Sequence, residues 1–244
     1  MMKVLAIGNS FSQDATRYLR KIAQASGEDM KVVNLYIGGC PLSRHFKNMN
    51  NDERAYSLEF GGETTGFSVS IKDALQSDEW DFVTLQQVSH KSPDYKTYQP
   101  YLDALSAYVT FHAPCAKQVI HQTWAYEDGS ARLTEEMGYE TSTQMFSDIK
   151  AAYGKAAKAI SADRIIPSGE SMHLAVRHSF HNTHRDTFHA SLGPGRYLLA
   201  ATWFEALTEK SVVGNSFCDL DVPTDLDTIS LMQEIAHEAV ESYR

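Results

Sequence analysis

Residues 4–10 read VLAIGNS, an apolar run that ends in a Gly-Asn-Ser turn. A short apolar run of this kind is typical of a strand buried on both faces of a parallel sheet. The segment 14–25 follows, and its apolar residues recur at helical spacing up to a stop signal at Gly27. The chain therefore opens as strand, turn and helix, and Ser10 lies where the strand ends.

The same alternation continues along the chain. Further strands are predicted at 31–37, 80–85, 118–123 and 164–167, and helices at 98–111, 142–160, 198–207 and 229–240. Strands alternating with helices indicate a parallel sheet covered on both faces. No repeat or Pro/Gly-rich linker divides the pattern, so we predict a single α/β domain over residues 1–244. Sheets of this kind bind ligands at the carboxyl ends of their strands.

Two long segments, 41–66 and 124–139, interrupt this alternation. The first is polar and the second is acidic and aromatic. Long insertions at strand ends often form the substrate cleft of an α/β fold, but they can equally be surface loops with aromatic anchors. The sequence leaves both interpretations open.

The composition excludes some partners. With 244 residues and 43% hydrophobic side chains, the chain can bury a full core. Its 31 acidic and 22 basic side chains give a formal net charge of −9, which argues against a nucleic-acid partner. No apolar run approaches the roughly 20 residues that a bilayer span needs, so no membrane partner is predicted. The sequence makes no prediction of the oligomeric state.

The N-terminus and the cysteines favour a cytoplasmic protein. The first apolar stretch is too short for a signal peptide, although a leader removed before residue 1 is the alternative. The three cysteines form no CxxC pair, which indicates neither a disulfide framework nor a thiolate zinc site.

A carboxylate and an imidazole stand three residues apart in the stretch 185–191, which reads RDTFHAS. Asp186 can fix the tautomer of His189, and His189 can then accept the proton of the Ser10 hydroxyl. Alone, Ser10 is more simply interpreted as a helix cap, and an Asp-x-x-His match is weak in a chain with ten histidines. Together, in this order and at the ends of predicted elements, the three residues predict a serine hydrolase.

These residues resemble the motifs of the SGNH (GDSL-type) hydrolases, in particular a branch catalogued mainly as domains of unknown function. That superfamily has Gly-Asp-Ser near the N-terminus, a glycine after the second strand, an asparagine after the third, and Asp-x-x-His near the C-terminus. The resemblance implies a three-layer α/β/α sandwich of flavodoxin-like type. It also implies that Ser10 is the nucleophile, Asp186 the orienting acid and His189 the general base.

The resemblance extends to the oxyanion hole, with two departures. It implies donors from the backbone N–H of Ser10, which opens a helix, and from a glycine of Gly38-Gly39, of which we choose Gly39. Asn9 replaces the usual aspartate, at little expected cost. No asparagine follows the third strand, where the sequence reads LQQVS (85–89). Since a glutamine amide carries the same N–H donors, we expect Gln87, or less readily Gln86, to be the third donor.

A group of histidines near the C-terminal third raises the question of a metal site. The group comprises His173, His178, His181, His184 and His189. It contains no cysteine and no helical His-x-x-x-His pair with a third carboxylate ligand, so we predict neither a metal nor another cofactor. We expect His181 instead to line the mouth of the pocket.

The sequence thus predicts a serine esterase acting on a small-molecule or glycan ester. We favour a short acyl group, such as acetyl, on a sugar, because Trp124, Tyr126 and Tyr139 offer stacking surfaces, and because the family often acts on such substrates. A lysophospholipase or thioesterase is an alternative that requires a wide apolar groove. A non-catalytic carbohydrate-binding relative is another, and a metal-dependent hydrolase is a third.

Overall fold

A seven-stranded sheet forms the centre of the computed structural model, which describes residues 1–244. Its strands are β1 (Met2–Gly8), β2 (Met30–Tyr36), β3 (Tyr56–Phe60), β4 (Glu63–Val69), β5 (Phe82–Leu85), β6 (Lys117–His121) and β7 (Arg164–Ile166). They are arranged in the order β4-β3-β2-β1-β5-β6-β7. The five strands from β2 to β7 are parallel, while β3 and β4 add an antiparallel hairpin at one edge.

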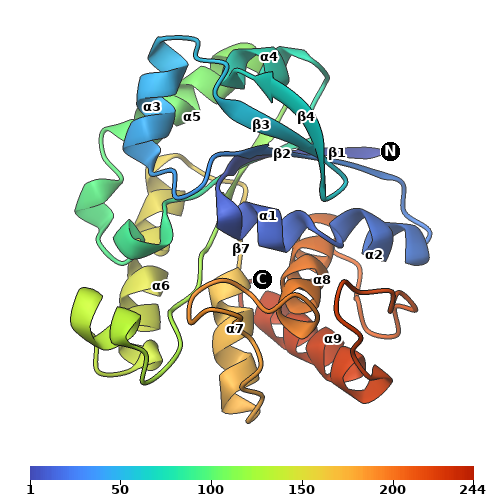
Figure 1. Cartoon of the computed structure of the whole chain (residues 1–244). Coiled ribbons are helices and arrows are strands. Elements are labelled where there is room, and N and C mark those ends of the chain that lie inside the picture. The colour runs from blue at the N-terminus through green and yellow to red at the C-terminus, as the bar shows by residue number, and fades with distance from the viewer.

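Helices cover both faces of this sheet (Figure 1). One face carries α1 (Ser10–Thr16), α2 (Leu19–Ala25), α8 (Pro194–Thr208) and α9 (Leu226–Glu241). The other carries α3 (Leu42–Asn50), α4 (Ile71–Gln76), α5 (Tyr101–His112) and α6 (Ser142–Ala159), and α7 (Ser168–Arg177) packs between α6 and α9. The predicted α/β/α sandwich with a mainly parallel sheet is therefore confirmed.

The core explains why the strands read as apolar runs. In β1, residues 4–7 are at most 1% exposed because helices cover both of its faces. One contiguous cluster of 63 buried hydrophobic residues extends through the sheet and both helix layers. None of the helices has the length and the apolar character that crossing a bilayer requires.

The segment 41–66 is neither an insertion that forms the substrate cleft nor a surface loop, the two interpretations that the sequence left open. It forms α3, all of β3 and the start of β4, so it extends the sheet rather than forming a loop. The antiparallel hairpin was not expected from the sequence. Its outer strand β4 is exposed along almost its whole length, so it lacks the apolar pattern of the buried strands.

The order of the parallel strands locates the ligand-binding edge. β1 is flanked by β2 on one side and β5 on the other, so the strand order reverses at β1. A crevice forms at such a switch point, outside the carboxyl ends of the strands. The segments that follow β2, β5 and β6 gather at the left of Figure 1, beside the start of α1.

Candidate active site

The turn between β1 and α1 presents Ser10 at this switch point. Asn9 caps α1, because its side-chain oxygen accepts the Phe11 N–H at 3.0 Å. A Cβ atom on Gly8 would lie 2.3 Å from Ser12 Oγ, so only glycine fits beneath the turn. Ser10 is the first residue of α1, and its N–H has no carbonyl partner four residues back within that helix.

The structure brings Ser10, Asp186 and His189 together. His189 Nε2 lies 2.8 Å from Ser10 Oγ, and His189 Nδ1 lies 2.8 Å from Asp186 Oδ2. The backbone N–H of His189 also donates to Asp186 Oδ1 at 2.8 Å. With Nδ1 protonated against the carboxylate, Nε2 is the acceptor for the serine hydroxyl. The arrangement can therefore remove a proton from Ser10.

The Asp186 carboxylate is kept ionised by these contacts. Partial burial raises its pKa, but the hydrogen bonds from the His189 side chain and backbone N–H outweigh burial and lower the pKa overall. Asp186 therefore carries its negative charge at neutral pH, next to the ring that would become positive after proton transfer.

A fully buried carboxylate, Asp14, ties the loop of Asp186 and His189 to the helix of Ser10. Asp14 lies one turn after Ser10 on α1 and accepts a bond from the Ala190 N–H at 3.2 Å. It also pairs with Arg185 at 3.0 Å and with Arg196 at 2.8 Å. Two cations and one N–H compensate the buried charge, so the two halves of the site are held together electrostatically.

Trp124 supports the same loop from below, which corrects its predicted role. Its side chain is 0% exposed, and its ring stacks on Phe11 with centroids 3.9 Å apart. Its indole N–H donates to the Phe188 carbonyl at 2.8 Å. Trp124 is thus not a surface for stacking a sugar. Nearby Thr187 has φ +72°, a strained conformation for a β-branched residue, held in part by the Glu127 N–H on its carbonyl.

Gly39 lies where a second backbone donor is needed. It follows β2, has φ +58° and is exposed to the pocket beside Ser10. Its N–H makes no hydrogen bond within the chain. The N–H groups of Ser10 and Gly39 are therefore both available to an oxygen atom bound in this pocket.

Gln87 and Gln86 are structural braces, which corrects the predicted third donor. Both N–H bonds of the Gln87 amide go to Thr97, whose carbonyl and hydroxyl lie 3.0 and 3.1 Å away. The Gln87 amide oxygen accepts the N–H groups of Leu42 and Val88. Neither glutamine lines the pocket.

Gln86 belongs instead to a buried chain of amides beneath the turn. Its amide N–H donates to Asn9 at 2.9 Å, and its oxygen lies 2.7 Å from His121 Nδ1. The Asn9 amide in turn donates to the Cys40 carbonyl at 3.1 Å. An aspartate at position 9 could not make this last bond, so the departure from the family motif fits the local structure.

A pair of hydroxyl groups that the sequence did not reveal faces the pocket instead. Ser89 Oγ and the Tyr126 hydroxyl lie 2.9 Å apart, and both residues line the pocket of Ser10. One hydroxyl donates to the other, so the second hydrogen of the pair has no partner in the chain. The only sequence signal for Ser89 is its place two residues after Gln87.

The pocket holds about 300 Å³, and its lining includes Ser10, His189, Gly39, Ser89 and Tyr126. Tyr126 also borders a neighbouring pocket of about 130 Å³, and His181 lies there rather than beside Ser10. The predicted place of His181 at the mouth of the Ser10 pocket is therefore wrong. Tyr126 lines the pocket as expected, but its ring is only 1% exposed.

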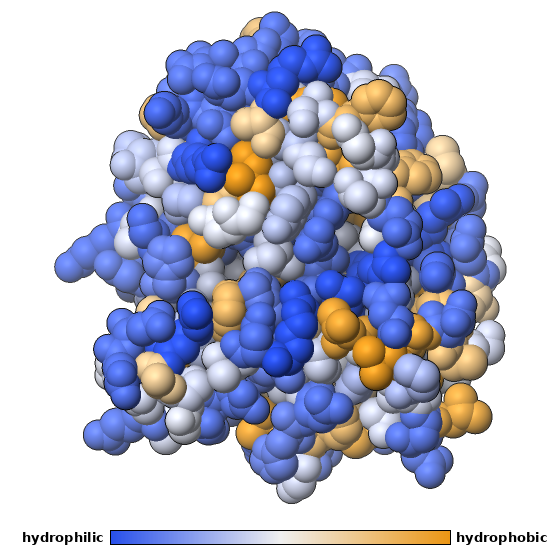
Figure 2. Space-filling model, viewed as in Figure 1, coloured by the Kyte–Doolittle hydropathy of each residue, from blue (hydrophilic) through white to orange (hydrophobic).

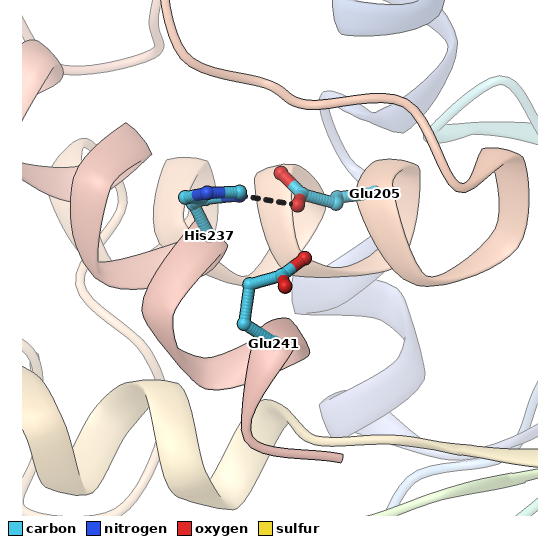
Figure 3. Close-up of side chains that lie close together, drawn as sticks. All are labelled: Glu205, His237 and Glu241. Atoms are coloured by element: carbon cyan, nitrogen blue, oxygen red, sulfur yellow. Dashed lines mark hydrogen bonds and ion pairs between the residues drawn. The ribbon is translucent and has the colours of Figure 1, made fainter. Parts of the chain in front are cut away.

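A second cluster of titratable groups lies away from this pocket, between α8 and α9. Figure 3 shows Glu205, His237 and Glu241, whose nearest ligand atoms all lie within 4.8 Å of one another. Glu205 already accepts the Val212 N–H at 2.9 Å and pairs with His237 at 2.6 Å. Arg244 contacts Glu241 and lies 3.8 Å from Glu205. These contacts account for the charges without a metal ion.

Comparisons with known proteins agree with this fold. A family model described as a domain of unknown function (DUF4886) matches residues 3–239. A DUF4886 protein from Bacteroides uniformis, known from a crystal structure, is 36% identical, with 98% of this chain and 95% of that chain covered and a TM-score of 0.91. No curated protein matches the chain in sequence.

Solved structures of lower sequence identity share the fold. A protein from Slackia heliotrinireducens described as a candidate SGNH hydrolase is 22% identical, with 84% of this chain and 97% of that chain covered and a TM-score of 0.60. An acetylxylan esterase from Geobacillus stearothermophilus is 14% identical, with coverages of 84% and 93% and a TM-score of 0.53. The resemblance to the SGNH fold, expected from the sequence, is thereby confirmed.

Proposed function

The chain belongs to the DUF4886 family and has the SGNH hydrolase fold, and from this premise we propose that it is a serine esterase for short-chain O-acyl esters. The observation that carries the proposal is the continuous path from Asp186 through His189 to Ser10, with both contacts at 2.8 Å. A carboxylate, an imidazole and a hydroxyl in this order form an activated nucleophile.

In the acylation step, Ser10 Oγ attacks the ester carbonyl while His189 Nε2 takes its proton. The carbonyl π bond opens to an oxyanion, and the tetrahedral intermediate then expels the alcohol, which receives the proton from His189. Asp186 stabilises the imidazolium that exists between these two transfers. In deacylation, His189 takes a proton from water as the water oxygen attacks the acyl-enzyme. The second tetrahedral intermediate then expels Ser10 Oγ, which takes the proton back from His189, and the carboxylic acid is released.

Three donors would stabilise the oxyanion. The N–H groups of Ser10 and Gly39 are the first two, because both are available beside the hydroxyl. The free hydrogen of the Ser89–Tyr126 pair takes the place that an asparagine amide has in the family motif. Donors of this kind contribute most to catalysis when they are held rigidly before the charge forms, and Tyr126 is held by burial.

The pocket favours a short acyl group on a polyhydroxyl alcohol such as a sugar. None of the large exposed hydrophobic side chains of the molecule lines it. Figure 2 shows a mainly hydrophilic face on which hydrophobic residues form only small areas. The acetylxylan esterase of the same fold supports acetyl transfer to water as a reaction this architecture can host. A long acyl chain would require an apolar groove beside Ser10.

Carbohydrate binding without catalysis is the alternative function for this fold. It has no need for an imidazole in contact with both a serine and a carboxylate. The strained backbone at Thr187, between the acid and the base, is a further cost that binding alone would not require.

The proposal is tested by initial rates on p-nitrophenyl acetate and p-nitrophenyl octanoate. We expect the acetate to be the better substrate, and Ser10→Ala to lower kcat by at least about 1000-fold. Ser230→Ala, which removes an exposed hydroxyl on α9, is the matched control and should leave the rate unchanged. EDTA should not change the rate. Activity of Ser10→Ala near that of the wild type would refute the proposal.

A further inference from the structure

Arg132 is the single permanently charged side chain that lines the pocket of Ser10. It begins the short helical segment Arg132–Glu136, in the aromatic stretch after β6. Its presence contrasts with the chain as a whole, whose formal net charge is −9. A lone cation in a small pocket attracts an anionic solute and repels a cationic one.

The position of Arg132 is fixed by aromatic rings. Its guanidinium carbon lies 4.1 Å from the ring centroid of Phe188 and 5.9 Å from that of Tyr126. Stacking on a ring face orients the planar guanidinium and leaves its edge N–H groups free to bind a carboxylate. Besides these ring contacts, Arg132 makes one side-chain hydrogen bond to Tyr126, which leaves most of its five N–H donors free.

The protein itself satisfies this charge only weakly. The one ion pair of Arg132 is with Glu136 at 3.7 Å, and their side chains are 36% and 62% exposed. An exposed pair at this distance contributes little, so a ligand can replace Glu136 at small cost. His90, which also lines the pocket, adds no second cation at neutral pH, because burial and the nearby Lys91 and Arg132 lower its pKa.

The neighbours of Arg132 show which part of an ester it would meet. His189 must deliver a proton to the departing alcohol, so the alcohol portion lies on the His189 side of Ser10. The ring of Phe188 lies 3.8 Å from the ring of His189, and Arg132 covers Phe188. The carbonyl oxygen points away from His189, toward the N–H groups of Ser10 and Gly39. Arg132 therefore borders the space of the alcohol.

We propose that Arg132 selects esters whose alcohol portion carries a carboxylate. One guanidinium matches the single charge and the two oxygens of a carboxylate, whereas a phosphate dianion would leave one charge uncompensated. The inference rests on the proposed esterase function and names the substrate class of the same site.

A matched pair of small probes tests it. 4-Acetoxybenzoate carries a carboxylate on its alcohol portion, and 4-acetoxybenzamide is its neutral counterpart of similar size. We expect the ratio of kcat/KM for the anionic over the neutral probe to fall about tenfold from wild type to Arg132→Gln, because dividing the two ratios cancels the different intrinsic reactivities. The neutral probe is the internal reference for each enzyme, so any general loss of activity in Arg132→Gln cancels from the ratio.

Three controls define the outcome. Arg132→Lys should retain part of the preference, because lysine keeps the charge but lacks the paired N–H donors that bind both carboxylate oxygens. Arg54→Gln removes the same charge at an exposed site outside the pocket and should leave the ratio unchanged. Added salt should reduce the preference of the wild type, since Arg132 is partly exposed.

The result that overturns the inference is an equal ratio in wild type and Arg132→Gln. An Arg132-dependent preference for mono-p-nitrophenyl succinate over p-nitrophenyl acetate would also overturn it, by placing the anion on the acyl side. Absence of Ser10-dependent hydrolysis of every probe would instead refute the proposed function, so the two failures are distinguishable.

Discussion

The protein contains two carboxylate–histidine pairs that look alike locally and differ in what surrounds them. Asp186 and His189 lie at the surface, 2.8 Å apart, and the free ring nitrogen of His189 meets a serine hydroxyl in a pocket. Glu205 and His237 lie 2.6 Å apart, but there the carboxylate is fully buried and the histidine is exposed. No hydroxyl accompanies the second pair.

The difference lies in the second contact of each partner. The other oxygen of Asp186 accepts a hydrogen bond from the backbone N–H of His189, and this contact orients the ring. The other oxygen of Glu205 accepts a hydrogen bond from the N–H of Val212, and Glu205 also lies near Arg244. It therefore stabilises the end of α8. A short contact between a carboxylate and an imidazole is therefore not evidence of chemistry until the third group is identified.

The largest expected effect distinguishes the two carboxylate–histidine pairs by their roles in catalysis. Asp186→Asn should lower kcat by about 10⁴-fold, because the amide favours the wrong tautomer of His189. Glu205→Gln should change kcat by less than about threefold and should instead lower the thermal unfolding temperature. Initial rates and thermal unfolding of both variants measure the contrast. Similar losses of activity in the two would show that the pairs are not functionally different.

The second prediction concerns the groups that the catalytic pair faces. The double variant Ser89→Ala/Tyr126→Phe should lower kcat by about 100-fold, as loss of one oxyanion donor does. Each single variant should cost less, since one hydroxyl hydrogen remains to serve as the donor. Gln87→Ala is the control: it should lower stability, because four hydrogen bonds are lost, more than kcat per folded molecule. The reverse pattern would restore Gln87 as the third donor.

The third prediction concerns the attachment of the catalytic pair to Ser10. Asp14→Asn removes the carboxylate that Arg185 and Arg196 share, and Arg196 keeps only its pair with Asp221. We expect kcat to fall about tenfold with KM nearly unchanged, because the loop loses its register against α1 while the pocket walls remain. Lowered stability of about 3 kcal/mol should accompany the change. An unchanged kcat would show that Phe188 and Trp124 hold the loop without Asp14.

The last prediction concerns stability rather than activity and rests on buried histidines whose ring nitrogens bond no carboxylate. Burial lowers the pKa of His45 and His121 to about 3 and that of His184 to about 4, from 6.5. The unfolded chain therefore binds more protons than the folded one below pH 6.5, so stability is lost as the pH falls from about 6.5 to 4. Each group contributes at most about 1.4 kcal/mol per pH unit. Urea unfolding at pH 7, 6, 5 and 4 measures the slope.

A control separates this effect from that of the acidic groups. Asp225 has a pKa lowered by hydrogen bonds from Thr228, so its stabilising contribution is lost only as the pH falls below the unfolded value near 4. The slope between pH 6.5 and 4 should therefore be the same in Asp225→Asn and shallower in His184→Gln. Constant stability across this window would contradict the assignment.

Much of the fold was predictable because the buried strands are encoded locally. β1 has a continuous apolar run and β2 has one interrupted only by Asn34, while the helix stripes of α5, α6 and α9 follow the 3.6-residue period. The predicted helix 14–25 proved to be two helices, because α1 begins at Ser10 and ends at Thr16, before α2. The edge hairpin β3–β4 escaped prediction because its exposed residues need no apolar pattern.

The site was predictable only where its chemistry was tied to sequence position. Ser10 ends a recognisable strand, and Asp186 and His189 are close in the chain. Which amide or hydroxyl faces the pocket depends on side-chain direction after β5, and the two glutamines point inward because buried backbone groups need partners there. The same holds for Trp124, whose burial follows from contacts with residues more than 60 positions away.

The link from Asp14 to Arg185 and Arg196 spans 171 and 182 residues. During synthesis, the first helix is complete long before either arginine leaves the ribosome. Burying that helix for good at this stage would trap an uncompensated charge, so its final docking must wait for the last third of the chain. Catalytic competence is accordingly a late event of folding, and labelling with a serine-directed inhibitor would count only molecules whose two ends have met.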